Sequence, residues 1–271
     1  ICRSECLIAN GAGGGPGMSM TMEGRVSTRP RGESMYFGMA VLCAVIAFAG
    51  FAPTYWLPVS QGRFAANPIV HIHGLVFSGW SLFLVWQTWL ATSGHIVRHR
   101  RVGLIGVVFA TAMTIFGVLA RINLMRVGAA AGQDAAARAF GFVPLSSIAF
   151  FAIVVTIAIV RARQRDVHKR LMLVASVSIV DAAIARMFFV LLAPPGAAGT
   201  VPPVMADVGP GLVTCALLLI PMVQDWRLYG RPHAAYVWGG LSLFALKVLE
   251  VPIAESAAWQ SVAGGILALA G

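Results

Sequence analysis

Seven stretches of the sequence are long and apolar enough to cross a lipid bilayer, and this feature constrains the fold most. A membrane-spanning helix needs about 20 mostly apolar residues. The stretches are residues 36–56, 68–93, 102–121, 140–160, 170–193, 207–224 and 235–254. Only 11% of the residues are charged, against about 25% in a soluble domain. The pattern predicts an all-α, polytopic transmembrane helix bundle with about seven spans.

The two ends of the chain differ from this apolar centre. Residues 1–34 are rich in glycine and carry no apolar run, which predicts a disordered or non-native N-terminal extension and not a signal peptide. Residues 258–271 are apolar but too short to span a bilayer. They are expected to form a C-terminal tail that lies at the interface or packs on the bundle. The seven-helix domain is therefore expected to cover residues 35–257.

Basic residues are distributed unevenly over the connections between the spans. Fourteen Lys and Arg residues fall in the N-terminal segment and in alternate connections, whereas three fall in the others. Because basic loops stay in the cytoplasm, the N-terminus is predicted inside and the C-terminus outside a bacterial cytoplasmic membrane. The net charge of +10 is explained by this anchoring. The expected partners are the lipid bilayer and other subunits of a membrane complex, and no nucleic acid is expected, because no basic run lies in a soluble module.

Histidines accompany the basic residues where three predicted helices begin. These residues are His99, His168 and His233, and His95 lies one turn before His99. Imidazoles at similar depth can bind a transition metal or a haem iron, so these four are candidate metal or cofactor ligands. The alternative is that they are interfacial residues. The neighbouring arginines and the helix N-termini favour an anion, such as a lipid phosphate or a haem propionate.

A second pair of histidines, His71 and His73, opens the span that follows Pro68. Residues two apart on a helix diverge by about 200°, so one of these rings is expected to face the bundle. Both are candidate cofactor ligands. A single histidine with another axial partner, a copper site or a quinone site would all fit this position, and Gly74 would let a flat ligand or another helix approach closely.

Charged residues inside the spans predict a polar interior. At 1.5 Å per residue, Asp181 lies about 16 Å into its span and Lys247 about 18 Å into its own. Matching depths predict a contact between the two, because charged groups in a bilayer pair with each other or line a polar cavity. Glu250 follows Lys247 by one turn, and Arg121 and Arg186 lie nearer the outer face. The alternatives are a structural ion-pair network, or arginines that extend to the interface.

Several motifs resemble those of known membrane proteins. They are His71-Ile72-His73-Gly74, His99-Arg100-Arg101-Val102-Gly103, His168-Lys169-Arg170-Leu171-Met172 and His233-Ala234-Ala235-Tyr236-Val237-Trp238-Gly239. The chain after residue 36 resembles uncharacterised bacterial multi-span membrane proteins. More distantly, the histidine-led helix starts resemble cytochrome b561-type haem proteins and membrane factors of haem–copper oxidase assembly. This resemblance implies a bound haem b held by histidines on several helices.

Four functions remain open from the sequence, and enzymatic activity is not decided. The first is a haem- or metal-handling redox or assembly protein that uses the histidines. The second is a small-molecule transporter or binding protein built around Asp181, Arg186 and Lys247. The third is an accessory subunit of a membrane complex. The fourth is a rhodopsin-like protein that binds retinal through Lys247, which lies midway along the seventh span.

Overall fold

The computed structural model describes residues 33–192, 196 and 199–270, which form helices joined by short connections and contain no strand. The predicted N-terminal extension, residues 1–34, lies outside the described residues except for its last two. The helices are α1 (Glu33–Phe51), η1 (Ala52–Trp56), α2 (Leu57–Ser60), α3 (Pro68–Thr92), α4 (Ile96–Ala130), α5 (Asp134–Val160), α6 (Arg165–Leu192), η2 (Val204–Asp207), α7 (Val208–Leu217), α8 (Leu219–Tyr229), α9 (Ala234–Ala254) and α10 (Ala257–Ala270).

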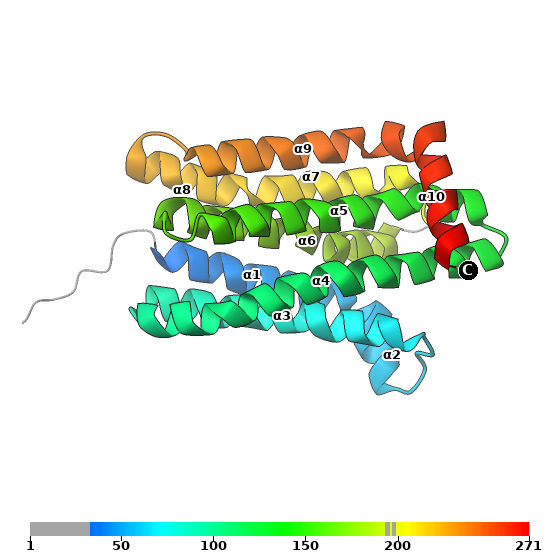
Figure 1. Cartoon of the computed structure of the whole chain (residues 1–271), viewed down its shortest axis with the longest axis horizontal. Coiled ribbons are helices and arrows are strands. Elements are labelled where there is room, and N and C mark those ends of the chain that lie inside the picture. Colours follow the sequence, from blue (N-terminus) through cyan, green and yellow to red (C-terminus); the bar gives the residue numbers. More distant parts are fainter. Residues whose placement is uncertain (1–32, 193–195, 197–198, 271) are drawn as a thin grey trace, which may run out of the picture. The chain divides into compact units, whose positions relative to one another are not determined.

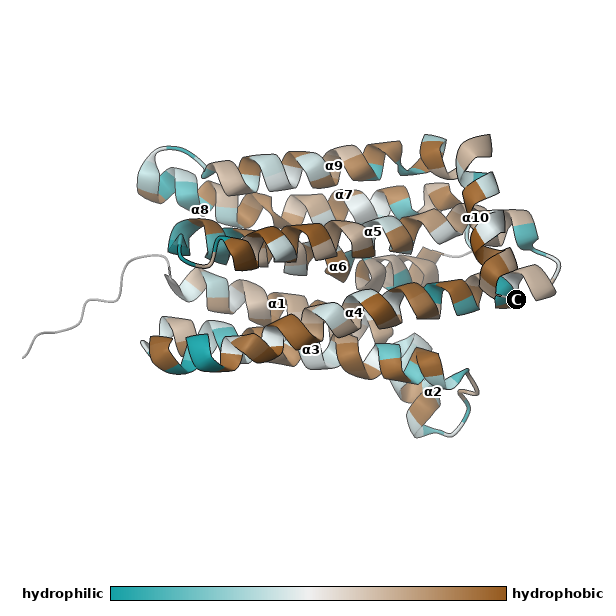
Figure 2. Cartoon of the chain, viewed as in Figure 1, coloured by the Kyte–Doolittle hydropathy of each residue, from teal (hydrophilic) through white to brown (hydrophobic). Residues whose placement is uncertain are grey.

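Seven helical segments of the described chain are long and apolar enough to span a membrane, which confirms the predicted number. Apolar residues run along the helices, while hydrophilic residues gather at their ends and in the loops (Figure 2). Many bulky apolar side chains point outward, as lipid contact requires. The chain is therefore a multi-pass membrane protein, and the direction in which it is inserted stays a prediction.

The helices run alongside one another in a bundle (Figure 1). Each of α1, α3, α4, α5 and α6 packs against two others of this group, so that the five helices form a closed ring. Helix α7 packs on α6, and α9 packs on α5, α6 and α7. Helices α5 and α6 therefore belong both to the ring and to a second group that includes α7 and α9.

The interior of the ring is filled by large side chains and by close helix contacts. Trp80 of α3 meets Phe151 of α5 edge to face, with ring centroids 5.3 Å apart. A Cβ atom on Gly50 of α1 would lie 2.3 Å from the carbonyl oxygen of Ala183 on α6. Only glycine permits this approach, which is how small residues join helices in lipid.

Several helix boundaries differ from the predicted ones. Helix α4 continues to Ala130, nine residues beyond the predicted end, because Arg121 and Arg126 interrupt the apolar run without breaking the helix. The sixth span is interrupted at Leu218, between α7 and α8. Pro221 explains the interruption, since proline has no N–H for the carbonyl group four residues earlier and its ring clashes with that group.

The C-terminal tail forms α10, which packs on the bundle. Helix α10 crosses the ends of α4 and α5 (Figure 1). The indole Nε1 of Trp259 donates a hydrogen bond of 2.8 Å to the carbonyl oxygen of Arg138. Arg138 in turn pairs with Asp134 at the start of α5. Helix α10 has 14 residues, is shorter than the seven candidate spans and covers one end of the bundle.

Candidate functional site

Lys247 of α9 lies at the centre of a buried cluster that contains three carboxyl groups. Its Nζ atom is 2.5 Å from Oδ2 of Asp181 on α6, 3.0 Å from Oδ2 of Asp207 in η2 and 2.9 Å from Oε1 of Glu250, one turn along α9. All four side chains are at most 4% exposed. The predicted contact between Asp181 and Lys247 is confirmed, and so is the position of Glu250 on the same face. We call these four residues the lysine cluster.

Hydroxyl groups complete the surroundings of the lysine cluster. The Thr214 hydroxyl of α7 lies 2.9 Å from Oδ1 of Asp181, to which it can donate. Ser147 Oγ accepts from Lys247 Nζ at 3.4 Å, and Ser146 Oγ donates to Glu250 Oε1 at 3.4 Å. The cluster is thus assembled from α5, α6, η2, α7 and α9.

Two local features bring these groups together. A Cβ atom on Gly211 of α7 would lie 2.7 Å from Cδ of Lys247, so the glycine leaves room for the lysine stem. Asp207 ends the short η2 turn and is 2% exposed. Asp207, Thr214 and Ser147 are not among the site residues predicted from the sequence. Asp207 is the first residue of the predicted sixth span, a position typical of the membrane boundary, so its sequence position gave no sign of burial.

One carboxyl oxygen of the lysine cluster has no hydrogen-bond partner among the described residues. It is Oε2 of Glu250, a side chain that is 1% exposed. Buried polar atoms are nearly always paired. A carboxylate oxygen that lacks a donor in this surrounding is a natural position for a proton.

A second buried ion pair lies at the arginine-rich end of the bundle, where α4 and α6 begin. Arg170 of α6 binds Asp225 of α8 through two hydrogen bonds, of 2.8 Å from Nε and 2.7 Å from Nη2. Both side chains are 3% exposed. Asp225 also accepts from the backbone N–H of His233 at 3.2 Å. Arg170 is the first residue of the predicted fifth span, and the structure places its side chain in the packed interior.

Two of the histidines predicted at the starts of helices make the same kind of contact. Nδ1 of His99 on α4 lies 3.1 Å from the carbonyl oxygen of Gln87 on α3, and Nδ1 of His168 on α6 lies 2.8 Å from that of Ala158 on α5. In each pair of consecutive helices, α3 with α4 and α5 with α6, a histidine near the start of the later helix contacts a backbone carbonyl near the end of the earlier one. The repeated sequence motif therefore corresponds to a repeated hairpin contact.

The other two histidines of this end have different partners. His95 precedes α4, stacks on Trp89 with ring centroids 5.7 Å apart, and binds Ser93 Oγ at 2.9 Å. His233 caps α9, where its Nδ1 accepts from the N–H of Ala235 at 3.1 Å. Within residues 33–192 and 199–270, no three His, Cys, Asp or Glu side chains form a group that could hold a metal ion.

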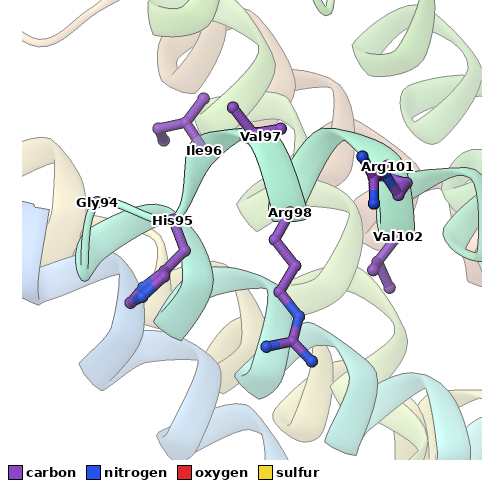
Figure 3. Close-up of a pocket in the computed structure, with 7 residues that line it drawn as sticks. All are labelled: Gly94, His95, Ile96, Val97, Arg98, Arg101 and Val102. Atoms are coloured by element: carbon purple, nitrogen blue, oxygen red, sulfur yellow. The ribbon is translucent and has the colours of Figure 1, made fainter.

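A shallow pocket of about 580 Å³ lies at the start of α4 and is lined by residues 94–98, 101 and 102. Figure 3 shows His95 and Arg98 extending to one side of the helix start and Ile96 and Val97 to the other. All lining residues come from one short stretch. The pocket is therefore a recess between neighbouring side chains and not an opening into the bundle.

The opposite end of the bundle holds the remaining predicted residues. Arg121 is 9% exposed, donates to the carbonyl oxygen of Ala137 at 3.1 Å and lies over the Phe140 ring. Nδ1 of His71 lies 3.1 Å from the hydroxyl of Tyr55. His73 packs on Phe77, with ring centroids 4.1 Å apart.

Arg186 completes this group, and its guanidinium carbon is 4.8 Å from the centroid of the Phe51 ring. The structure thus separates the predicted buried polar residues into three places. Asp181, Lys247 and Glu250 lie in the lysine cluster, and Arg186 lies near the end of α6 with the aromatic side chains of α1. Arg121 lies between α4 and α5, because its partners belong to those helices.

The cap at His233 makes the stability of the protein depend on pH. Burial, followed by the charge of Arg170, lowers the pKa of His233. The folded protein therefore favours the neutral ring. The contribution of the His233 cap to folding stability is complete above the ordinary histidine pKa of about 6.5. It is lost as the pH falls from there through the lowered pKa, because the unfolded chain binds the proton first.

We expect His233→Ala to lose about 0.5–2 kcal/mol near neutral pH, the usual effect of removing a helix cap. His233→Asn keeps a capping oxygen and should retain the stability while losing its acid sensitivity. Thermal unfolding in detergent at several pH values measures both effects. Equal stability of His233→Ala and the wild type at neutral pH would show that the cap contributes nothing.

Comparison of the chain with protein-family models, with curated proteins and with solved structures found no match.

Proposed function

We propose that this protein is a small-molecule transporter of the membrane, in which the lysine cluster binds and releases protons. The observation that carries the proposal is the ratio of charges: three carboxyl groups surround one ammonium group, and all are buried. If all four groups were ionised, the cluster would hold two uncompensated negative charges inside the bundle. Charges buried in a membrane protein are costly unless they are paired.

A bound proton relieves this imbalance. Like charges that share a site disfavour each other's ionisation, so that such a group of carboxyls exchanges protons as a unit. The unpartnered Oε2 of Glu250 is one place for the proton. In this exchange a proton passes from water to a carboxylate oxygen of the lysine cluster, and no other reactant takes part.

Proton binding would also change the forces between helices. The lysine cluster joins α6, α9 and the η2–α7 junction through contacts with a single ammonium group. Adding a proton to Asp181 or Asp207 weakens one of these contacts and leaves the others. A two-state packing of α6 against α7 and α9 would respond to that change, as transporters require.

The test uses purified protein in lipid vesicles that enclose a pH-sensitive dye. When a panel of organic solutes is added outside, the wild type should move protons with at least one of them. Asp181→Asn and Asp207→Asn should reduce this flux to the level of empty vesicles. Asp134→Asn is the matched control, because Asp134 is 41% exposed and pairs with Arg138 at the end of the bundle. Proton movement that survives both cluster substitutions would contradict the proposal.

Haem binding by histidines is a second candidate, favoured by the contacts of His99 and His168. A carbonyl oxygen only accepts, so Nδ1 of each ring has to carry the hydrogen. In the neutral ring Nε2 then keeps its lone pair, which is the arrangement of metal-ligating histidines. The visible spectrum of the purified protein, with and without dithionite, tests this candidate. A colourless protein that contains no iron, copper or zinc would eliminate it.

A further inference from the structure

The outward face of α4 continues into the arginine-rich start of this helix. Val97, Leu104 and Val108 are 76%, 72% and 68% exposed, and their spacing of seven and four residues places them on one helix face. Bulky apolar side chains that stay exposed on a multi-pass membrane protein contact the acyl chains of lipids. Arg101 follows Val97 by four residues and precedes Leu104 by three, so it lies on the same face. A lipid on this face therefore meets Arg101 at the end of the helix.

The shallow pocket of about 580 Å³ lies at this point of the surface. It is lined by residues 94–98, 101 and 102, and we call it the α4 recess. Figure 3 shows the guanidinium group of Arg98 and the imidazole ring of His95 extending to the same side of the helix start. The His95 ring stacks on Trp89 of α3. The α4 recess thus combines the two guanidinium groups of Arg98 and Arg101 with a ring that a neighbouring helix holds in place.

The helices around the α4 recess supply no carboxylate to its guanidinium groups. Residues 34–133, which include α3, α4 and their connection, contain no Asp or Glu. Arg98 and Arg101 are exposed and take part in none of the ion pairs formed by the residues that the structure describes. Asp166 and Asp225, at the same end of the bundle, already pair with basic side chains of α6. The α4 recess is therefore a cationic site open to an anion from outside these helices.

From these observations we propose that the α4 recess binds the phosphate group of an anionic phospholipid, whose acyl chains lie along the exposed apolar face of α4. A guanidinium group binds two oxygens of a phosphate through parallel hydrogen bonds. The first N–H groups of α4 add further donors, because the side chain of His95 makes no cap hydrogen bond to them. The apolar face beyond Arg101 favours a lipid over a free phosphate ion, which has no apolar part to place there.

The other charges at this end of the bundle favour a lipid with a net negative charge. Hydrophilic residues gather at the helix ends (Figure 2). The exposed arginines at the starts of α4, α6 and α9 and in the connections before them are Arg98, Arg100, Arg101, Arg161, Arg163, Arg165, Arg227 and Arg231. They repel the choline cation of phosphatidylcholine, whereas the headgroup of phosphatidylglycerol contains no cation. Phosphatidylglycerol is therefore the probe for the α4 recess.

The test is native mass spectrometry of the detergent-purified protein with added phosphatidylglycerol. Arg98→Gln combined with Arg101→Gln should weaken binding about tenfold or more, because each basic residue near a membrane surface contributes a factor of about five. Arg163→Gln combined with Arg165→Gln is the matched control, since it removes the same charge where α5 passes into α6. The control should bind like the wild type, because these two residues do not line the α4 recess. If the first pair does not fold, the single variants Arg98→Gln and Arg101→Gln decide, each with about a fivefold loss.

Further probes separate the phosphate group from the acyl chains. Phosphatidylcholine should bind more weakly than phosphatidylglycerol, and so should a phosphatidylglycerol with short acyl chains, which buries less apolar surface on α4. Excess inorganic phosphate should not displace the lipid, and displacement would identify a site for a free anion and overturn the proposal. Equal losses in the two double variants would show attraction by net charge alone and would overturn it as well. The same holds if the wild type binds no phosphatidylglycerol or binds phosphatidylcholine equally well.

Discussion

The Lys247→Met variant is expected to lose about 3–5 kcal/mol of folded-state stability, the usual effect of removing one partner of a buried ion pair. Lys247 binds Asp181, Asp207 and Glu250 at 2.5–3.0 Å, and none of them has another cation among the described ion pairs. Without the ammonium group, three buried carboxyls face each other. Thermal unfolding of the purified protein in detergent measures the loss.

The chain offers a matched control for this substitution, because Lys169 is its only other lysine. Lys169 pairs with Asp166, which is 68% exposed, and exposed pairs contribute about 0–1 kcal/mol. Lys169→Met should therefore be nearly neutral. Adding Asp181→Asn and Asp207→Asn to Lys247→Met should recover part of the lost stability. If Lys247→Met unfolds at the temperature of the wild type, the lysine cluster does not stabilise the bundle.

The Arg170→Met variant is expected to be destabilised by a similar amount, about 3–5 kcal/mol. Asp225 would stay buried, keeping the N–H of His233 at 3.2 Å as a donor but losing both guanidinium hydrogen bonds. Adding Asp225→Asn should restore stability in part, because the amide removes the unpaired charge. Unfolding in detergent again provides the measurement.

Arg163→Met is the control for this substitution, because Arg163 is exposed in the connection between α5 and α6. It should leave the stability unchanged. The paired variant, Arg170→Met with Asp225→Asn, should be more stable than Arg170→Met alone. The reverse order would show that the two side chains do not act as a pair.

Depth along a helix is the part of the site that could be predicted from the sequence. Counting residues from the start of each span placed Asp181 and Lys247 at the same level, and the structure confirms their contact. The same count placed Glu250 one turn from Lys247. A rise of 1.5 Å per residue depends only on the helix, so this estimate needed no knowledge of the neighbouring helices.

Rotation and neighbours could not be predicted in the same way. His95, His99, His168 and His233 begin their helices at one end of the bundle, but each has a different hydrogen-bond partner. Which face of a helix points inward is decided by the five-helix ring and by the packing of α7 and α9 on it. The depth of each histidine along its helix therefore does not determine whether the four imidazole rings meet at one site.

Polar residues at the ends of spans were missed for a related reason. Asp207 and Asp225 lie near the two ends of the sixth span, where polar residues usually meet water. The structure buries both, because Asp207 binds Lys247 of α9 and Asp225 binds Arg170 of α6. A proline such as Pro221 is compatible with a break in the helix, but its position in the sequence does not show which side chains are buried.

Infrared spectroscopy of the carboxyl groups tests the central claim, that the lysine cluster binds and releases protons. Spectra of the purified protein are recorded while the pH is raised, and the C=O band of protonated carboxylic acid is followed. The wild type should show such a band, and the band should disappear as the pH rises. It should weaken or shift in Asp181→Asn, Asp207→Asn and Glu250→Gln but not in Asp134→Asn. A band that is absent at every pH at which the protein is folded, or one that the three cluster substitutions leave unchanged, would contradict the claim.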